Sequence, residues 1–256
     1  VVILGSGDIG MIMARRMTLE GAKVLGVFEI QPYASGLPRN IEQCLNDYQI
    51  PLHLSHSVTE IRGVDRLESV VISEVDDRLQ PIPGTEKEYP CDTLILSVGL
   101  IPENELTWMA GAKQDDGTKG ASVDENFQTT VPGVFAAGNV LHVHDLVDFV
   151  SMEAEELADG AARYIKEGAL PDCGLAITGD SMVGQLTPAR FSGTGNVTVS
   201  FRMRKPVRNC TVELWQGDHL VKQKKFPKAL PAEMIQIGLK PEELNEKDNL
   251  EVRVVC

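Results

Sequence analysis

The first thirty residues alternate between short apolar runs and a stretch of helix-forming residues. Residues 1–4 form an apolar run typical of a short buried strand, and residues 9–20 contain good helix formers. Gly21 follows, at a position where a left-handed helix stop is favoured. Residues 24–29 are again apolar and β-branched, so the order strand, helix, strand predicts a βαβ unit.

The pattern continues with one more helix and four more strands up to residue 98. A helix is predicted to start near Pro38 and to run through Leu45, because proline favours a first helical position. We expect strands in the remaining apolar or alternating runs, which are residues 51–55, 57–61, 67–75 and 92–98. The second and third of these runs alternate enough for an antiparallel hairpin, and the fourth ends at Gly99.

The second half of the chain changes character twice. Residues 100–133 are rich in loop-forming residues, and a short strand is predicted at 134–137. A long helix is expected from about residue 145 to 166, ended by Gly168 and Pro171. Beyond Pro171, apolar and polar residues alternate without helical patterns, which predicts a small antiparallel β-sandwich or barrel and places a domain boundary near residue 172.

Charge and composition narrow the function classes. The net charge is −13; residues 1–172 hold 12 basic against 28 acidic residues (−16), and residues 173–256 hold 12 against 9 (+3). Such asymmetry suggests two units of different character. An acidic surface repels phosphate backbones and aromatic residues make up only 5%, so no nucleic-acid partner is expected. No apolar run approaches the roughly 18 residues of a membrane span, so none is predicted.

The five cysteines are scattered and none forms a C-x-x-C pair. This usage is typical of reduced thiols and predicts a cytoplasmic protein. Cys44, Cys91 and Cys210 lie in apolar patterns and are expected in the core. Cys173 lies at the predicted domain junction, where a reactive thiol is the alternative to a structural one.

The clearest motif is a turn with G-x-G-x-x-G spacing, formed by Gly5, Ser6, Gly7, Asp8, Ile9 and Gly10. It follows a predicted strand and opens a predicted helix, as in dinucleotide-binding proteins. Gly5 permits the tight turn, Gly7 lets the backbone approach a pyrophosphate, and Gly10 lets helix and strand pack closely. The helix N-terminus then receives the anion. The alternative is a glycine turn that merely closes a buried βαβ unit.

Glu29 ends the second strand, 19 residues after Gly10. A carboxylate there accepts hydrogen bonds from the ribose hydroxyls of adenosine and repels a 2′-phosphate. The first arginine beyond it is Arg39. The sequence therefore predicts NAD rather than NADP as the nicotinamide cofactor.

Two further stretches, residues 92–103 and residues 129–140, carry a resemblance to a known family. The first is a buried strand that breaks into a turn, and the second reads T-T-V-P-G-V-F-A-A-G-N-V. Together with the glycine motif they resemble the two-dinucleotide-binding-domain flavoproteins, the pyridine nucleotide–disulfide oxidoreductase superfamily, over roughly residues 1–168. The resemblance implies FAD and NAD as cofactors, with Val98, Gly99, Gly138 and Asn139 at the cofactors.

The same resemblance implies a domain order within an α/β fold of Rossmann type. It places an NAD-binding Rossmann domain with a parallel sheet at 1–93, the C-terminal half of an FAD-binding domain at 94–171, and the β-sandwich at 172–256. Residues 40–44 and 138–145 are most similar to a subgroup associated with anaerobic glycerol 3-phosphate dehydrogenase and with the alpha subunits of sarcosine and opine oxidases.

The sequence departs from the family pattern in three ways. Asn139 replaces the Asp that contacts the flavin ribitol, and no redox-active cysteine pair is present. The family's first glycine motif, which holds the ADP half of FAD, is expected upstream of Val1. The flavin is therefore expected to be held together with a further N-terminal segment, and a fragment lacking that segment is expected to be inactive alone.

The implied activity is hydride transfer between NADH and flavin, which needs no acid–base side chain, so no catalytic residue is assigned. One alternative is a dinucleotide-binding or sensing subunit, or an electron-transfer subunit, that performs no chemistry. Another is a single-Rossmann dehydrogenase, in which His142 or His144 would have to transfer a proton.

Two remaining patterns have a structural and a functional interpretation each. His142, His144, Asp145 and Asp148 could form a metal site, but a flavin-side loop or a solvated helix start is the favoured explanation, and no metal is predicted. The basic residues from Arg202 to Arg208, with Lys222, Lys224 and Lys225, fit a solvated sheet face. They could instead dock an acidic protein partner, such as another subunit of an electron-transfer complex.

Overall fold

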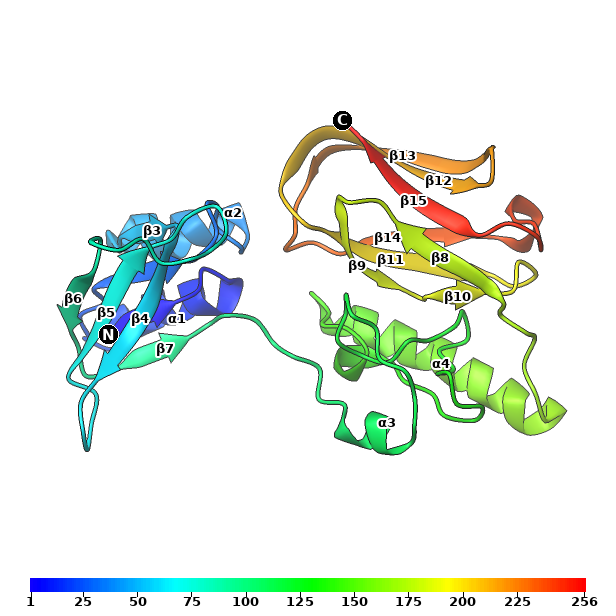
Figure 1. The fold of residues 1–256 in the computed structure, drawn as a ribbon, viewed down its shortest axis with the longest axis horizontal. Helices are drawn as coiled ribbons and strands as arrows, with labels where there is room; N and C mark the ends of the chain where they lie inside the picture. The colour runs from blue at the N-terminus through cyan, green and yellow to red at the C-terminus, as the bar shows by residue number, and fades with distance from the viewer. The chain divides into compact units, whose positions relative to one another are not determined.

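The computed structural model describes all residues from 1 to 256 and divides them into two compact units, Val1–Gly99 and Leu100–Cys256. Figure 1 shows the elements of both units, with the first in blue to cyan. The first unit extends to Gly99, because the strand Leu94–Leu96 pairs within it. Residues 100–256 form the second compact unit, and the assignment of residues 94–171 and 172–256 to separate domains stays a prediction.

The first unit is built on a parallel four-stranded sheet in the order β3-β2-β1-β7. Its strands are β1 (Val2–Leu4), β2 (Gly26–Glu29), β3 (Leu52–Leu54) and β7 (Leu94–Leu96). All neighbouring pairs run parallel. This confirms the predicted Rossmann-type α/β fold.

Both faces of this sheet are covered, which explains why its strands are nearly continuous apolar runs. Successive residues of a strand point to opposite faces. Ile3 and Val27 therefore pack with helix α1, whereas Val2 and Phe28 pack on the opposite face with strand β5.

Helix α1 (Asp8–Leu19) follows β1 and buries Gly10, Met11 and Ala14. Gly21 adopts the left-handed conformation predicted for it, with φ +87°. The predicted helix at 38–45 is less regular than expected: it consists of α2 (Pro38–Asn40), a π-helical turn η1 (Ile41–Leu45) and a 3-10 turn η2 (Asn46–Tyr48).

A second, antiparallel sheet has the order β4-β5-β6. Strands β4 (His56–Arg62) and β5 (Ser69–Glu74) form the predicted hairpin, and β6 (Lys87–Pro90) pairs with β5. Val70 and Ile72 of β5 are fully buried beneath the parallel sheet. This small sheet therefore covers the face of the parallel sheet that α1 does not.

The second unit begins with loops, the short helix α3 (Glu105–Met109) and the 3-10 turn η3 (Gly138–Val140). The strand predicted at 134–137 does not form; only an isolated bridge joins Gln128 to Phe135. Helix α4 (Val147–Glu167) follows and ends at Gly168 in the left-handed conformation, as predicted. It is the longest helix of the chain, and no helix is long and apolar enough to cross a membrane.

The rest of the second unit is a β-sandwich. Its five-stranded sheet has the order β10-β8-β15-β12-β13 and its three-stranded sheet the order β14-β11-β9. The strands are β8 (Leu175–Gly179), β9 (Val183–Thr187), β10 (Arg190–Phe191), β11 (Val197–Met203), β12 (Val207–Gln216), β13 (His219–Ala229), β14 (Ile235–Leu239) and β15 (Leu250–Val255), with a 3-10 turn η4 (Pro241–Glu243) before the last. The expected antiparallel pairing holds except between β8 and β15, which run parallel.

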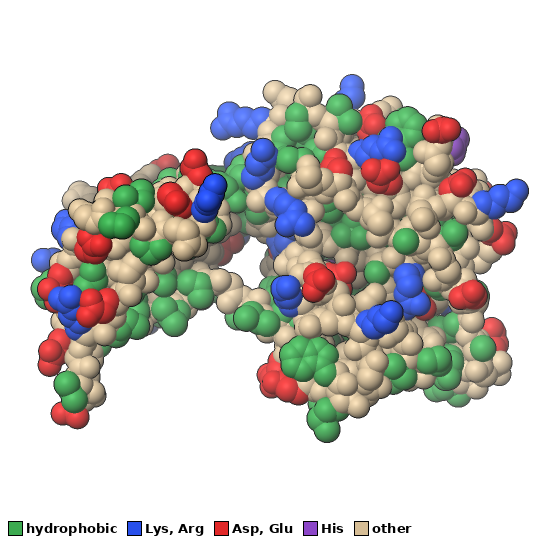
Figure 2. All heavy atoms as spheres, viewed as in Figure 1, with side chains coloured by type: hydrophobic (Ala, Val, Ile, Leu, Met, Phe, Trp, Pro, Cys, Tyr) green, Lys and Arg blue, Asp and Glu red, His purple; other side chains and the backbone are tan.

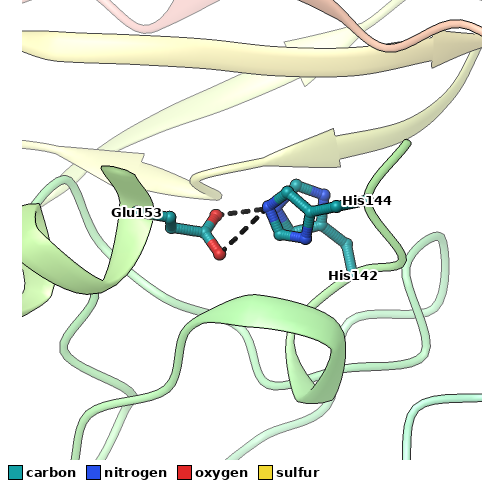
Figure 3. A group of neighbouring side chains, drawn as sticks. All are labelled: His142, His144 and Glu153. Atoms are coloured by element: carbon teal, nitrogen blue, oxygen red, sulfur yellow. Dashed lines mark hydrogen bonds and ion pairs between the residues drawn. The ribbon is translucent and has the colours of Figure 1, made fainter. Parts of the chain in front are cut away.

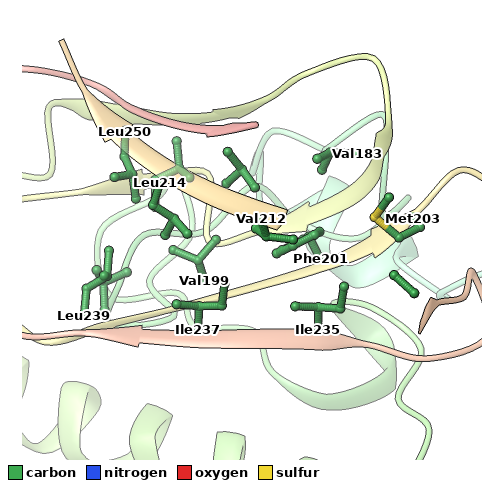
Figure 4. Close-up of a cluster of buried hydrophobic side chains, with 14 of the residues drawn as sticks. Val183, Val199, Phe201, Met203, Val212, Leu214, Ile235, Ile237, Leu239 and Leu250 are labelled. Atoms are coloured by element: carbon green, nitrogen blue, oxygen red, sulfur yellow. The ribbon is translucent and has the colours of Figure 1, made fainter. Parts of the chain in front are cut away.

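The predicted alternation places its apolar members between the two sheets. Phe201 of β11, Val212 and Leu214 of β12, and Val252 of β15 are fully buried, and Figure 4 shows residues of β12 facing those of β11 and β14. Their polar neighbours face outward, as a two-sheet sandwich requires.

Basic residues of the sandwich have acidic or carbonyl partners nearby. Lys222 pairs with Glu243 at 3.3 Å, Arg253 pairs with Glu251 at 2.7 Å, and Arg202 donates to Asp145 and to two backbone carbonyls. Figure 2 shows acidic and basic side chains intermingled on the face that is viewed. The assignment of the basic residues from Arg202 to Arg208, with Lys222, Lys224 and Lys225, to a solvated sheet face stays a prediction.

Candidate functional site

The glycine turn lies between β1 and α1, against the end of β7. Gly5 has φ +95°, and a Cβ atom there would lie 2.1 Å from the carbonyl oxygen of Ser97. A Cβ atom at Gly10 would lie 2.7 Å from the carbonyl oxygen of Gly5 and 2.8 Å from Ser97 Cβ. Both positions therefore need glycine because the backbone of the turn packs directly on β7.

Gly7 differs from its two neighbours in the motif. Its backbone is extended (φ −60°, ψ 161°), and the nearest atom to an added Cβ would be Ser97 Oγ at 3.4 Å, an ordinary contact distance. The protein itself would accept a Cβ atom at this position. A ligand that approaches the backbone closely is a physical reason for glycine here.

The carboxylate of Glu29 is buried and accepts four hydrogen bonds. Only 4% of the residue is exposed. Its Oε2 accepts hydrogen bonds from Ser6 N (2.9 Å), Ser6 Oγ (2.6 Å) and Ser35 Oγ (2.5 Å), and its Oε1 accepts one from Gln31 N (3.0 Å). Ser6, inside the glycine motif, thus fixes the carboxylate beside the turn.

Asp8 is the first residue of α1, and its carboxylate accepts hydrogen bonds from other residues of the protein. Its Oδ1 accepts hydrogen bonds from Leu37 N (2.8 Å) and Asn40 Nδ2 (2.6 Å), and Gly36 N donates to the carbonyl oxygen of Ser6 (3.0 Å). These bonds hold the segment after β2 against the start of α1. Ile9, also in the motif, is 69% exposed.

A cavity of about 440 Å³ opens beside the turn. Gly5, Gly7, Glu29, Val98 and Gly99 line it, all of them predicted cofactor residues. Gln31, Ser35, Ser57 and Ser97 also line it but were missed, because isolated polar residues in loops or at strand ends carry no spacing signal. Since the first backbone N–H groups of α1 have no side-chain cap, this cavity can receive an anion at its glycine-lined end and hydroxyl groups at Glu29.

The second predicted turn, Gly138-Asn139, lies in the second unit and begins η3. Gly138 has φ +72°, and Asn139 Oδ1 accepts a hydrogen bond from His144 N at 3.1 Å. Asn139 lines a cavity of about 290 Å³ together with Ile101, Pro102 and Val140. The chain after β7 and the Gly138-Asn139 turn, which were paired from sequence alone, therefore meet at one cavity.

A buried carboxylate from α4 holds this turn. Glu153 Oε2 accepts a hydrogen bond from Gly138 N at 2.5 Å, and Glu153 Oε1 lies 2.7 Å from His142 Nε2. Burial raises the pKa of Glu153, but its polar contacts with His142, His144 and Gly138 outweigh burial and lower the pKa to about 2. Glu153 was missed because nothing in the sequence separates it from its acidic neighbours Glu155 and Glu156.

The structure separates His142 and His144 from the two aspartates that follow them in the sequence. The side chains of His142 and His144 are only 1% and 3% exposed, so a solvated helix start is the wrong interpretation for them. Asp145 instead binds Arg202 and the backbone N–H of Met234, and Asp148 lies exposed in the first turn of α4. Neither aspartate belongs to the histidine cluster.

The cysteines are free, and three of the five are buried: Cys44, Cys173 and Cys210. Cys91, predicted in the core, is only partly buried. Burial, with nearby Asp124 and Glu125, raises the pKa of the Cys173 thiol to about 12. Cys173 is therefore protonated near neutral pH, which argues against a reactive thiolate.

Comparison with known proteins identifies relatives of the same kind. Residues 1–163 match the family described as pyridine nucleotide-disulphide oxidoreductase. The NADH oxidase of Methanocaldococcus jannaschii is 28% identical over 222 residues, which is 80% of this chain and 44% of that protein. The glutamate synthase [NADPH] small chain of Escherichia coli is 25% identical over 184 residues, which is 65% of this chain and 39% of that protein.

Among solved structures, thioredoxin reductase from T. acidophilum superposes with a TM-score of 0.53 at 26% identity. The match covers 66% of this chain and 52% of that one. The chain therefore spans about half the length, or less, of these relatives. Because the family match covers more than half of the sequence, the chain belongs to the pyridine nucleotide-disulphide oxidoreductase family, a family of FAD- and NAD(P)-binding oxidoreductases.

Proposed function

We propose that this chain forms the nicotinamide-binding part of an FAD-dependent NADH oxidoreductase. The first unit would bind NADH along the turn from Gly5 to Gly10, with Glu29 at the adenosine ribose. The Gly138-Asn139 turn of the second unit would contact the flavin. The family match and the names of the relatives, which include NADH oxidases, support this class of reaction.

The observation that carries the proposal is the contrast between Gly7 and the other two motif glycines. Contacts within the protein require glycine at positions 5 and 10, but they leave room for a side chain at position 7. A motif that only closed a βαβ unit would not need this third glycine. A pyrophosphate resting on the backbone at the N-terminus of α1 supplies the missing reason.

The preference for NADH rests on Glu29. Its carboxylate is already oriented by Ser6 and Ser35, so a ribose diol would meet an acceptor that needs little reorganisation. A 2′-phosphate at the same place would meet a buried negative charge. Relatives named for either NADH or NADPH are both found, so this preference is a property proposed for this chain.

On the flavin side, Asn139 offers hydrogen bonds without charge. Its side-chain oxygen is engaged by His144 N, and its exposed amide nitrogen remains a donor toward a ligand hydroxyl. Gly138 N donates a hydrogen bond to Glu153, and the backbone of Gly138 adopts the left-handed conformation at the start of the turn. We infer that these residues position the ring-bearing cofactor and do not transfer protons.

The two cofactors, when bound, supply the hydride chemistry themselves. The residues of this chain bind and orient them and exclude water, so we assign no catalytic residue. We further propose the narrower relationship to flavoproteins associated with anaerobic glycerol 3-phosphate dehydrogenase, supported by residues 40–44 and 138–145. A cytoplasmic location is proposed from the five unpaired cysteines.

An anaerobic absorbance spectrum of the full-length gene product, recorded before and after addition of NADH, tests the proposal. We expect a flavin band that is bleached by NADH in the wild type and persists in Gly7→Val, whose flavin content should match. A protein that stays colourless after reconstitution with FAD yet binds NADH would instead identify a non-catalytic sensing subunit.

A further inference from the structure

Three side chains of the second unit converge at one buried point. His142 and His144 extend from the loop after η3, and Glu153 extends from α4. Their ligand atoms all lie within 4.8 Å of one another. Figure 3 shows both imidazole rings on one side of the carboxylate, each with a ring nitrogen turned toward it.

His144 is the residue of this cluster whose buried ring makes no hydrogen bond. Its side chain is 3% exposed, and neither ring nitrogen has a hydrogen-bond partner. Nε2 lies 3.2 Å from Glu153 Oε2, but this contact does not have hydrogen-bond geometry. A polar ring buried without partners destabilises a protein unless a further group satisfies it.

The donor set has a specific chemistry. Two imidazole nitrogens and one carboxylate are the ligands found in zinc sites that keep an open position and in non-haem iron sites. We propose that His142, His144 and Glu153 bind a divalent transition-metal ion of the zinc class. A metal ion would give Nε2 of His144 a partner and would balance the charge of the buried Glu153 carboxylate.

The observed spacing is close to what such an ion needs. Ligands at about 2.0–2.1 Å from zinc with tetrahedral angles lie roughly 3.3 Å apart. The contact between His144 Nε2 and Glu153 Oε2 is 3.2 Å, and the contact between His142 Nε2 and Glu153 Oε1 is 2.7 Å. Of these two distances, the first already fits, and the second has to lengthen by several tenths of an ångström.

An outer hydrogen bond also suits the assignment. Gly138 N donates to Glu153 Oε2, and an outer hydrogen bond of this kind orients a ligating carboxylate. Glu153 Oε1 accepts the proton of His142 Nε2 in the metal-free protein, and a metal ion bound at this nitrogen would release that proton. Water would complete the coordination of a three-ligand site.

The proposal separates the histidines from the two aspartates beside them. In sequence, Asp145 and Asp148 are the nearest carboxylates, but Asp145 is bound to Arg202. Glu153, two turns into α4, takes their place. The proposal concerns only residues of the second unit and holds whether or not the chain binds NADH.

Zinc binding to the full-length protein tests this site. The protein is freed of purification tags, stripped with a chelator and titrated with Zn²⁺ by calorimetry, and its metal content is measured after gel filtration. We expect one tightly bound zinc per chain. His144→Ala and Glu153→Gln should each weaken zinc binding at least 100-fold, whereas His219→Ala, which changes the histidine at the start of strand β13, should leave it unchanged.

Circular dichroism of the stripped proteins shows whether each variant is folded. If His144→Ala does not fold, Glu153→Gln tests the same site, because it keeps the size of the side chain and removes its charge. Cobalt(II) should give visible ligand-field bands in the wild type that are lost in the variants. Failure of the stripped wild type to take up one equivalent of zinc, or binding in both folded variants as tight as in wild type, would overturn the proposal.

Discussion

At the scale of single residues, the carboxylate beside the glycine turn could be predicted from sequence spacing, but the residues that hydrogen-bond to it could not. Glu29 was identified because it ends a strand at a fixed distance from Gly10. Ser35 and Gln31, which bind the same carboxylate, lie in an irregular segment where no periodicity marks them. Glu153 escaped prediction for a similar reason, because its hydrogen bonds to Gly138 and His142 depend on how α4 packs.

Glu29→Gln should reduce the preference for NADH over NADPH. The substitution keeps the shape of the side chain but removes the charge that repels a 2′-phosphate, and hydrogen bonds to a charged group contribute about 1.5–3 kcal/mol. We expect the ratio of the NADPH and NADH dissociation constants to fall about 10-fold or more in fluorescence titrations. Ser35→Ala, which leaves the carboxylate in place, is the matched control. An unchanged ratio would remove Glu29 from the ribose site.

Cys173 should resist alkylation in the folded protein. Its raised pKa of about 12 means that the thiol, and not the thiolate, is present at pH 8, and its side chain is buried. Cys256, which is exposed, should be labelled by iodoacetamide first, with Cys173 labelled only after unfolding. Peptide mass spectrometry over time measures both rates, and equal rates would contradict the structural role given to Cys173.

At the scale of elements, strong periodicity was sufficient for the long helix and the sandwich strands, but not for short or irregular pieces. Helix α4 was predicted with its end at Gly168, and the alternation of β11 and β12 identified their buried faces. The prediction of a strand at 134–137 was wrong, because this segment pairs with its neighbour only at one isolated bridge. Along α4, Met152 and Ile165 are exposed although the apolar pattern includes them.

Gly160 within α4 gives a test of helix packing. Alanine normally stabilises a helix relative to glycine, but a Cβ atom at position 160 would lie 2.7 Å from the carbonyl oxygen of Asn126. We therefore expect Gly160→Ala to lower the free energy of unfolding by about 1–3 kcal/mol. Ser151→Ala, at an exposed position of the same helix, should change it by only a few tenths of a kcal/mol. Thermal unfolding compares the two, and a stabilised Gly160→Ala would show that α4 is not held against Asn126.

At the scale of the whole molecule, the fold class and its two kinds of sheet could be predicted, whereas the bonds that join distant segments within each unit could not. Leu94–Leu96 joins the first sheet by pairing with β1, a contact that sequence order does not reveal. Residues 100–171 and the sandwich form one unit because long-range bonds link them. Ser192 Oγ donates to Glu125 at 2.6 Å, and Ala189 N donates to the carbonyl oxygen of Val123 at 2.9 Å.

Truncation after residue 172 should therefore affect the two units differently. The first unit keeps all its strands and its cavity, so NADH binding should remain close to that of the longer chain. In the second unit, α4 would lose the sandwich beside it, and its amides should lose protection against hydrogen exchange. Exchange followed by mass spectrometry measures both units in one experiment. Full protection of α4 after truncation would show that residues 172–256 are an independent domain.

The central claim is that a dinucleotide pyrophosphate rests on the backbone of Gly7. The most direct test is equilibrium binding of NADH to wild type, Gly7→Ala and Gly7→Val, with melting temperatures measured alongside. Because the protein leaves room for a Cβ atom at position 7, Gly7→Ala should fold with nearly unchanged stability, and the melting temperature shows whether Gly7→Val is folded. NADH binding should weaken with side-chain size and be lost in Gly7→Val. NADH binding by a folded Gly7→Val as tight as that of wild type would contradict the account.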